Sequence, residues 1–159
     1  MRNPTGVLLM IIAMLLAGCA ATEKPAATAA AKPQRYMEFR RASYEEVPGY
    51  LLTRPPKEET RVFVAPEVLL NERDIVSTTI VKIEDKFGVG VEFNRAGARA
   101  LRTFTENGRG LYLAFIMDGE VRMVLPILTP VRDGRMLLSS GFDKPQADEL
   151  VREIRLRIP

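Results

Sequence analysis

The chain has no histidine, no tryptophan and a single cysteine among its 159 residues, and aromatic residues make up only 7% of it. Without histidine it lacks the commonest general base, the commonest metal ligand and the usual partner of a nucleophilic serine or cysteine. Its net charge of +3 and few aromatics do not fit the basic surface of a nucleic-acid-binding protein. We therefore expect no enzyme, metal, cofactor, small-molecule substrate or nucleic-acid partner.

A long membrane-spanning run is also missing at the N-terminus. The apolar segment from Val7 to Leu16 is about ten residues long, whereas a helix that crosses the hydrocarbon core needs roughly 20. It follows a short start that contains Arg2. This arrangement is typical of a signal peptide.

The segment ends in a short motif around the cysteine, formed by Leu16, Ala17, Gly18 and Cys19. The motif resembles the lipobox of a bacterial lipoprotein signal. The resemblance implies that the Cys19 thiol takes a diacylglycerol and that cleavage then removes residues 1–18. The alternative is an ordinary secretory leader with a chance cysteine.

Cys19 is the only cysteine, so the mature protein can form no internal disulfide and must be stabilised by its core. We expect the N-terminal acyl chains to anchor it to a membrane without spanning it. The lipobox implies that the protein lies in the cell envelope and faces the periplasm. In Gram-negative lipoproteins an Asp after the cysteine favours the inner membrane, so Ala20 favours the outer membrane.

The rest of the chain divides into a tether and a domain. Residues 19–34 contain the lipidated cysteine and an Ala-rich stretch that Pro25 and Pro33 interrupt. Residues 35–159 have the patterns of one globular domain, and a composition of 47% hydrophobic and 27% charged residues is that of a folded chain.

Several short segments of the domain predict β-strands, because they alternate in polarity or are rich in β-branched residues. They are residues 36–42, 60–65, 78–83 and 88–93. We expect the last two to pair through a connection at residues 84–87, with Val89, Val91 and Phe93 on one face.

Two segments predict helices packed on the sheet. One follows Asn94 as a plausible N-cap, and the other begins with Asp143 and Gln146 as a capping box. Their apolar faces are Gly97, Ala100, Leu101 and Phe104 in the first helix and Ala147, Leu150, Val151 and Ile154 in the second.

The most apolar part of the domain, residues 111–128, is split by Asp118-Gly119. This dipeptide favours a type I′ turn, so the stretch predicts a hairpin. Residues 111–117 are all apolar, as in a central strand buried on both faces. In the second strand we expect one apolar face, formed by Val121, Met123 and Leu125.

A membrane-spanning interpretation of this stretch fails, because each of its charged residues would cost about 2–3.5 kcal/mol near the bilayer centre. Residues 131–136 predict a further hairpin. Together the patterns predict an α+β fold in which two helices pack on a small mixed or antiparallel sheet.

The order of these elements, including "TENGRG", "DG" and "SSGF", resembles the head subdomain of the first periplasmic domain of SecD, a partner of the bacterial protein-export channel. The resemblance covers residues 36–158. It implies a module that binds polypeptide or another envelope protein through an exposed sheet edge, as an accessory to export. The alternative is a structural envelope lipoprotein with the same fold and no role in export.

Two sets of side chains have alternative interpretations. Arg95, Arg99 and Arg102 lie on the polar face of the first helix and could contact acidic lipids or an acidic partner, although a solvated face is favoured. Four methionines could line an adaptable polypeptide groove, but core packing is favoured. They are Met37, Met117, Met123 and Met136.

Overall fold

The computed structural model describes residues 36–55, 60–106, 111–138 and 141–159. These residues belong to a compact unit that extends from Lys32 to Pro159. The predicted signal peptide, the lipobox with Cys19 and the whole predicted tether lie outside the described residues. In the part of the chain that the structure describes, no helix has the length and apolar character needed to cross a membrane.

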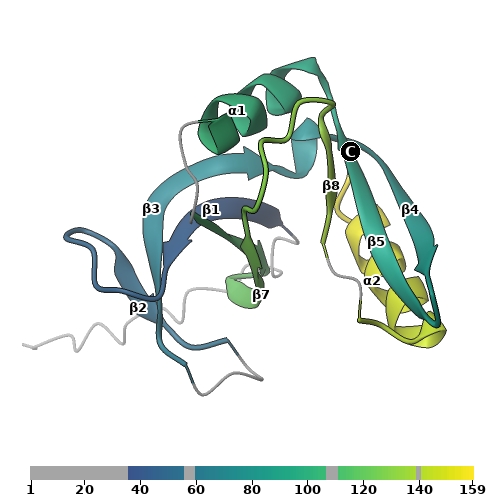
Figure 1. Ribbon diagram of the computed structural model, residues 1–159, viewed down its shortest axis with the longest axis horizontal. Helices are drawn as coiled ribbons and strands as arrows, with labels where there is room; N and C mark the ends of the chain where they lie inside the picture. The colour runs from purple at the N-terminus through teal and green to yellow at the C-terminus, as the bar shows by residue number, and fades with distance from the viewer. Residues whose placement is uncertain (1–35, 56–59, 107–110, 139–140) are drawn as a thin grey trace, which may run out of the picture. The chain divides into compact units, whose positions relative to one another are not determined.

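The described residues form strands and helices that confirm the predicted α+β class (Figure 1). The strands are β1 (Met37–Ser43), β2 (Leu51–Thr53), β3 (Val62–Asn71), β4 (Ile75–Ile83), β5 (Lys86–Phe93), β6 (Tyr112–Met117), β7 (Glu120–Pro126) and β8 (Arg135–Leu137). The helices are α1 (Arg95–Glu106), α2 (Lys144–Arg155) and the short 3-10 helix η1 (Glu72–Asp74). The strands form two antiparallel sheets, with the orders β2-β3-β1-β6-β7 and β4-β5-β8.

The predicted opening strand is confirmed as β1, which lies at the centre of the larger sheet between β3 and β6. Met37 and Phe39 are fully buried on its inner face. The short edge strand β2 was not predicted, because three residues give too little periodicity to identify a strand.

The strand predicted at residues 60–65 is longer, because β3 continues through Pro66. Arg40 pairs with Val68 while Ala42 pairs with Val64, so several residues of β3 bulge opposite one residue of β1. The Arg40 guanidinium donates to the Pro66 carbonyl over 2.8 Å. A proline is tolerated at a bulge because no ladder N–H is needed there.

The predicted central hairpin is formed by β6 and β7. Asp118 and Gly119 connect the strands with φ angles of 52° and 87°, both in the left-handed region. Residues 113–117 of β6 are buried, as expected for a strand covered on both faces.

A β-bulge in β7 overturns part of the predicted alternation. Phe115 pairs with Met123, but the next residue, Ile116, pairs with Val121, so Arg122 is the extra residue. Because a bulge shifts the register by one residue, Val121 faces a second apolar cluster while Met123 faces the main core. The prediction that they share a face is therefore wrong.

The predicted pair in the smaller sheet is confirmed as β4 and β5, and Val89, Val91 and Phe93 are buried together in the main core. The predicted four-residue connection is wrong. Ile83 pairs with Lys86, so the turn consists of residues 84 and 85.

The predicted hairpin at residues 131–136 is also wrong. Asp133 and Gly134 do form a bend, and Gly134 has a φ of 71°. However, the residues before the bend form no strand, and those after it become β8 and pair with β5. The Gly134 carbonyl accepts a hydrogen bond from the Phe93 N–H, so β5 supplies the partner that a local hairpin would have needed.

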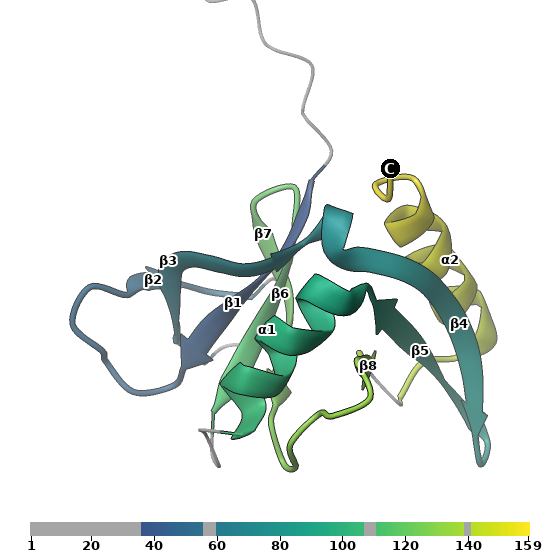
Figure 2. The ribbon, with the colours of Figure 1, turned by 90° about the horizontal axis from the view of Figure 1, so that it is seen from above.

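Both predicted helices are confirmed with their caps. Asn94 Oδ1 accepts hydrogen bonds from the N–H groups of Ala96 and Gly97, each over 2.9 Å. At α2, the Asp143 carboxylate accepts from the Gln146 N–H and the Gln146 side chain accepts from the Asp143 N–H. Figure 2 shows α2 running along β4 and β5, which it contacts.

The main core lies between these elements and takes side chains from both sheets and both helices. Its fully buried side chains include Phe39, Phe115, Leu101 and Ile154. Three of the four methionines named from the sequence are buried there, and the fourth packs against the core. The favoured interpretation that they fill the core is confirmed.

Candidate functional site

The edges of the two sheets differ in how open they are to another strand. Within the described ranges, the edge strands are β2, β4, β7 and β8. β2 and β8 have three residues each, and β7 is bulged at Arg122 and ends at Pro126. β4 has nine residues, and its register with β5 is continuous from Ser77 to Ile83. It is therefore the longest regular edge, and a regular edge is a template for strand pairing.

Hydrogen bonds on the far side of β5 show which backbone groups of β4 face outward. The N–H and C=O of Phe87 both bond to Phe142, and Val89 O accepts from the residue that follows β8. Lys82 lies opposite Phe87, and Ile80 lies opposite Val89. In an antiparallel ladder, opposed residues direct their backbone groups either toward each other or both away. The N–H and C=O groups of Ile80 and Lys82 therefore face away from β5.

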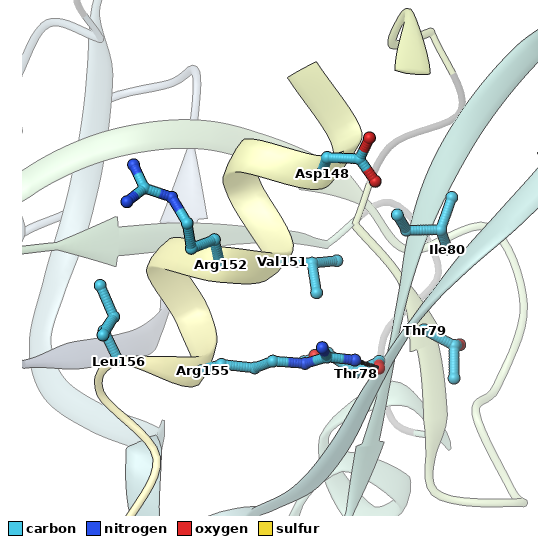
Figure 3. Close-up of a pocket in the computed structure, with 8 residues that line it drawn as sticks. All are labelled: Thr78, Thr79, Ile80, Asp148, Val151, Arg152, Arg155 and Leu156. Carbon is cyan, nitrogen blue, oxygen red and sulfur yellow. Dashed lines mark hydrogen bonds between the residues drawn. The ribbon is translucent and has the colours of Figure 1, made fainter. Parts of the chain in front are cut away.

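The same alternation places the backbone groups of Thr78 on this outer edge. Beside the edge, β4 and α2 enclose a groove of about 600 Å³ (Figure 3). Its lining combines strand and helix residues: Thr78, Thr79, Ile80, Asp148, Val151, Arg152, Arg155 and Leu156.

Arg155 reaches across this groove from the last turn of α2. Its Nη2 donates to the Thr78 carbonyl over 3.3 Å, and Figure 3 shows its extended side chain pointing at Thr78 while that of Arg152 points away from β4. Thr78 as a whole is 5% exposed. Its hydroxyl has no hydrogen-bond partner among the described residues.

The other charged residues of α2 beside the groove are paired within the helix. Lys144 Nζ lies 2.8 Å from Asp148 Oδ2, and Arg152 Nη2 lies 2.6 Å from Glu149 Oε1. The hydrogen bond from Arg152 lowers the pKa of Glu149, and the same bond raises the pKa of Arg152. Arg155, in contrast, has a neutral carbonyl as its hydrogen-bond partner.

The arginines predicted as a contact surface on α1 are all exposed, but the structure does not bring them to one site. Arg102 pairs with Glu106 over 2.9 Å. Arg99 lines a second groove of about 450 Å³ together with Arg41 of β1. Among the described residues, no contact of Arg95 indicates a binding site. Binding of lipid or an acidic partner by this face stays a prediction.

Asp118 and Gly119, named from the sequence as a turn, also connect distant elements. The Asp118 carboxylate accepts hydrogen bonds from the Arg157 guanidinium, which follows α2, and from the Tyr36 N–H. The turn thus joins the β6–β7 hairpin to the start of β1 and the end of α2.

Sequence reasoning missed Arg155 and Arg157. Arg155 lies four residues after the buried Val151, so helical spacing places it beside the apolar face. That spacing was an available signal, but it could not show that β4 would lie next to it. Cys19 and the lipobox lie outside the described residues. Across the described ranges, no three His, Cys, Asp or Glu side chains gather closely enough to hold a metal ion.

The protein is thus a small α+β domain with two curled antiparallel sheets, one of which has β4 as a long open edge. The family model of the SecDF P1 head subdomain matches residues 49–156, and the chain belongs to this family. The resemblance to a SecD head, predicted from the order of motifs, is confirmed.

Solved structures with a similar fold come from SecDF proteins. One is described as a membrane component that enhances protein export; it has a TM-score of 0.59 and 18% identity, with 79% of this chain and 64% of that chain covered. SecDF in a super-membrane-facing form has a TM-score of 0.60 and 18% identity, with 79% of this chain and 19% of that chain covered. SecDF from Thermus thermophilus, described as a translocon-associated membrane protein, has a TM-score of 0.55, 18% identity and coverage of 79% and 20%.

This chain therefore spans less than two thirds of each of these SecDF chains. At 18% identity the similarity establishes the fold alone. No curated protein matches the chain.

Proposed function

We propose that this protein is a lipid-anchored, non-enzymatic component of the bacterial cell envelope whose SecDF-head domain binds extended polypeptide along the outer edge of β4. The observation that carries the proposal is the length and regularity of that edge, which its sheet leaves unpaired on the outer side. The family supports a role as an accessory to protein export, since a SecDF structure is described as enhancing export.

In this proposal, the anchor is the acylated thiol of Cys19, exposed after cleavage of residues 1–18. Residues 19–34 are the tether and residues 35–159 are the binding domain. Ala20 favours the outer membrane over the inner membrane, and the domain faces the periplasm. Incorporation of labelled fatty acid that persists in a Cys19→Ala variant would contradict the anchor.

Binding would occur by strand addition, in which main-chain hydrogen bonds supply affinity for many sequences. An added strand would pair with the outward N–H and C=O groups of Thr78, Ile80 and Lys82. Its side chains would alternate between the groove beside α2 and the opposite face of the sheet. This geometry suits a non-native polypeptide, because an unfolded chain has free backbone groups along its length.

The test is photocrosslinking in intact cells. A photoreactive amino acid replaces Lys82 at the edge, and a matched control replaces Leu128, which is 80% exposed and lies outside the smaller sheet. We expect secretory polypeptides to crosslink from position 82 much more than from position 128. Equal crosslinking from both positions, or none from position 82, would refute edge binding. A fixed one-to-one adduct with another envelope protein would instead support the structural lipoprotein.

A further inference from the structure

The Thr78 carbonyl is one of the outward acceptors that an added strand would use, and in this structure it already has a partner. Arg155 Nη2 donates to it over 3.3 Å. A strand that pairs along the whole edge brings an N–H to the same carbonyl and competes there with the Arg155 side chain. That side chain is exposed, so it can move without disrupting the core.

Two polar groups need partners once Arg155 is displaced, one because of the displacement and one already before it. The guanidinium of Arg155 loses its acceptor. The hydroxyl of Thr78, the residue that Arg155 contacts, is buried and has no partner in the described ranges. A carboxylate matches this pair, because it can accept hydrogen bonds from both a guanidinium and a hydroxyl.

The surrounding charges favour an anion at this position. Asp148 and Glu149 are occupied by Lys144 and Arg152, respectively. Arg155 is thus the cation of the groove whose charge no carboxylate in the described structure neutralises. A ligand with a negative side chain would complement that charge, whereas a neutral strand would displace Arg155 without giving it a new acceptor.

We propose that the groove between β4 and α2 prefers extended polypeptide segments that carry an acidic side chain next to Thr78. Arg155 moves from the Thr78 carbonyl to the carboxylate of the ligand, and the carbonyl becomes free to accept a backbone N–H. This inference rests on the proposed strand addition at β4, and it adds the chemical class of the preferred segment.

The test uses the full chain purified in detergent and labelled peptides of alternating Thr and Val, matched in length to the pairing register of β4. One peptide set carries a single Glu, moved through successive positions, and the other carries Gln at the same positions. Both peptide sets have amidated C-termini, and an additional free-acid version of the Gln peptide tests whether a terminal carboxylate can substitute. Binding is followed by fluorescence anisotropy at low and high salt.

We expect the best Glu peptide to bind roughly threefold to tenfold more tightly than its Gln counterpart at low salt, with less difference at high salt. Arg155→Met should abolish this preference and bind the Gln peptide at least as tightly as the wild type does. Arg152→Met removes the same charge from the same groove but should keep most of the preference, because Arg152 is paired with Glu149.

Four results would overturn the inference. Equal binding of Glu and Gln peptides by the wild type, or an undiminished preference in Arg155→Met, would contradict acidic selection while leaving strand addition intact. If the free-acid Gln peptide alone showed the Arg155-dependent gain, the site would recognise chain termini instead of acidic side chains. If no peptide bound any variant, strand addition itself would fail.

Discussion

Proline substitutions at two neighbouring positions of β4 should separate strand addition from folding. Lys82 directs its N–H away from β5, whereas Val81 pairs with Gly88 and directs its N–H toward β5. Proline removes the N–H at either position. Lys82→Pro therefore removes a donor for an added strand, and Val81→Pro removes a bond of the existing sheet.

The expected magnitudes differ in the same way. Val81→Pro leaves the carbonyl of the buried Gly88 without its hydrogen-bond donor. An unpaired buried polar group lowers the unfolding free energy by about 1–3 kcal/mol. Lys82→Pro breaks no bond to β5, so its effect on unfolding should be clearly smaller. It should weaken peptide binding about twofold to tenfold, because one hydrogen bond contributes roughly 0.5–1.5 kcal/mol.

Urea unfolding followed by circular dichroism measures the first effect, and peptide anisotropy measures the second. Lys82→Gln controls for the lost charge and should bind more tightly than Lys82→Pro. Strand addition through the outward N–H of Lys82 is refuted if Lys82→Pro destabilises the fold as much as Val81→Pro does, or if Lys82→Pro binds peptide with wild-type affinity.

Other features give further predictions. Gly97→Ala should destabilise the domain by about 1–2 kcal/mol in urea unfolding, because a Cβ there would lie 2.9 Å from the Cβ of the last residue of η1; unchanged stability would show that the helix can shift freely. Arg157→Met should cost about 1–3 kcal/mol by removing the mostly buried partner of Asp118, and a thermal melt with an unchanged midpoint would contradict this link. In NMR titrations, Arg152→Gln should raise the pKa of Glu149. Because that pKa is lowered in the folded state, the stabilisation is complete above the ordinary pKa of the carboxyl and disappears as pH falls through the lowered one; a Glu149 pKa that is the same in both proteins would contradict it.

Local chemistry made some elements predictable from sequence. Asn94 and the Asp143–Gln146 box identify helix starts because their side chains satisfy N–H groups that every helix leaves unpaired. Asp118-Gly119 identifies a hairpin because both residues adopt positive φ. These signals depend on neighbours in sequence, so they hold whatever the tertiary fold.

Other features depend on distant partners and were not predictable. The bulge at Arg122 places Val121 and Met123 on opposite faces, although their spacing suggests one face. β8 pairs with β5 and not with its sequence neighbour. The groove also depends on tertiary packing, because Arg155 reaches Thr78 only when α2 packs beside β4. The sequence predicted that the sheet has an exposed edge. It could not predict that β4 forms this edge, because that depends on the order of the strands in the sheet.

The central claim, that an extended polypeptide pairs with β4, is tested most directly by amide hydrogen exchange measured residue by residue with and without peptide. In the free protein, the N–H groups of Thr79 and Val81 should exchange slowly, while those of Thr78, Ile80 and Lys82 should exchange fast. Bound peptide should slow the latter three and leave the former two unchanged. Protection that appears elsewhere, or outward amides that still exchange fast when peptide is bound, would contradict the account.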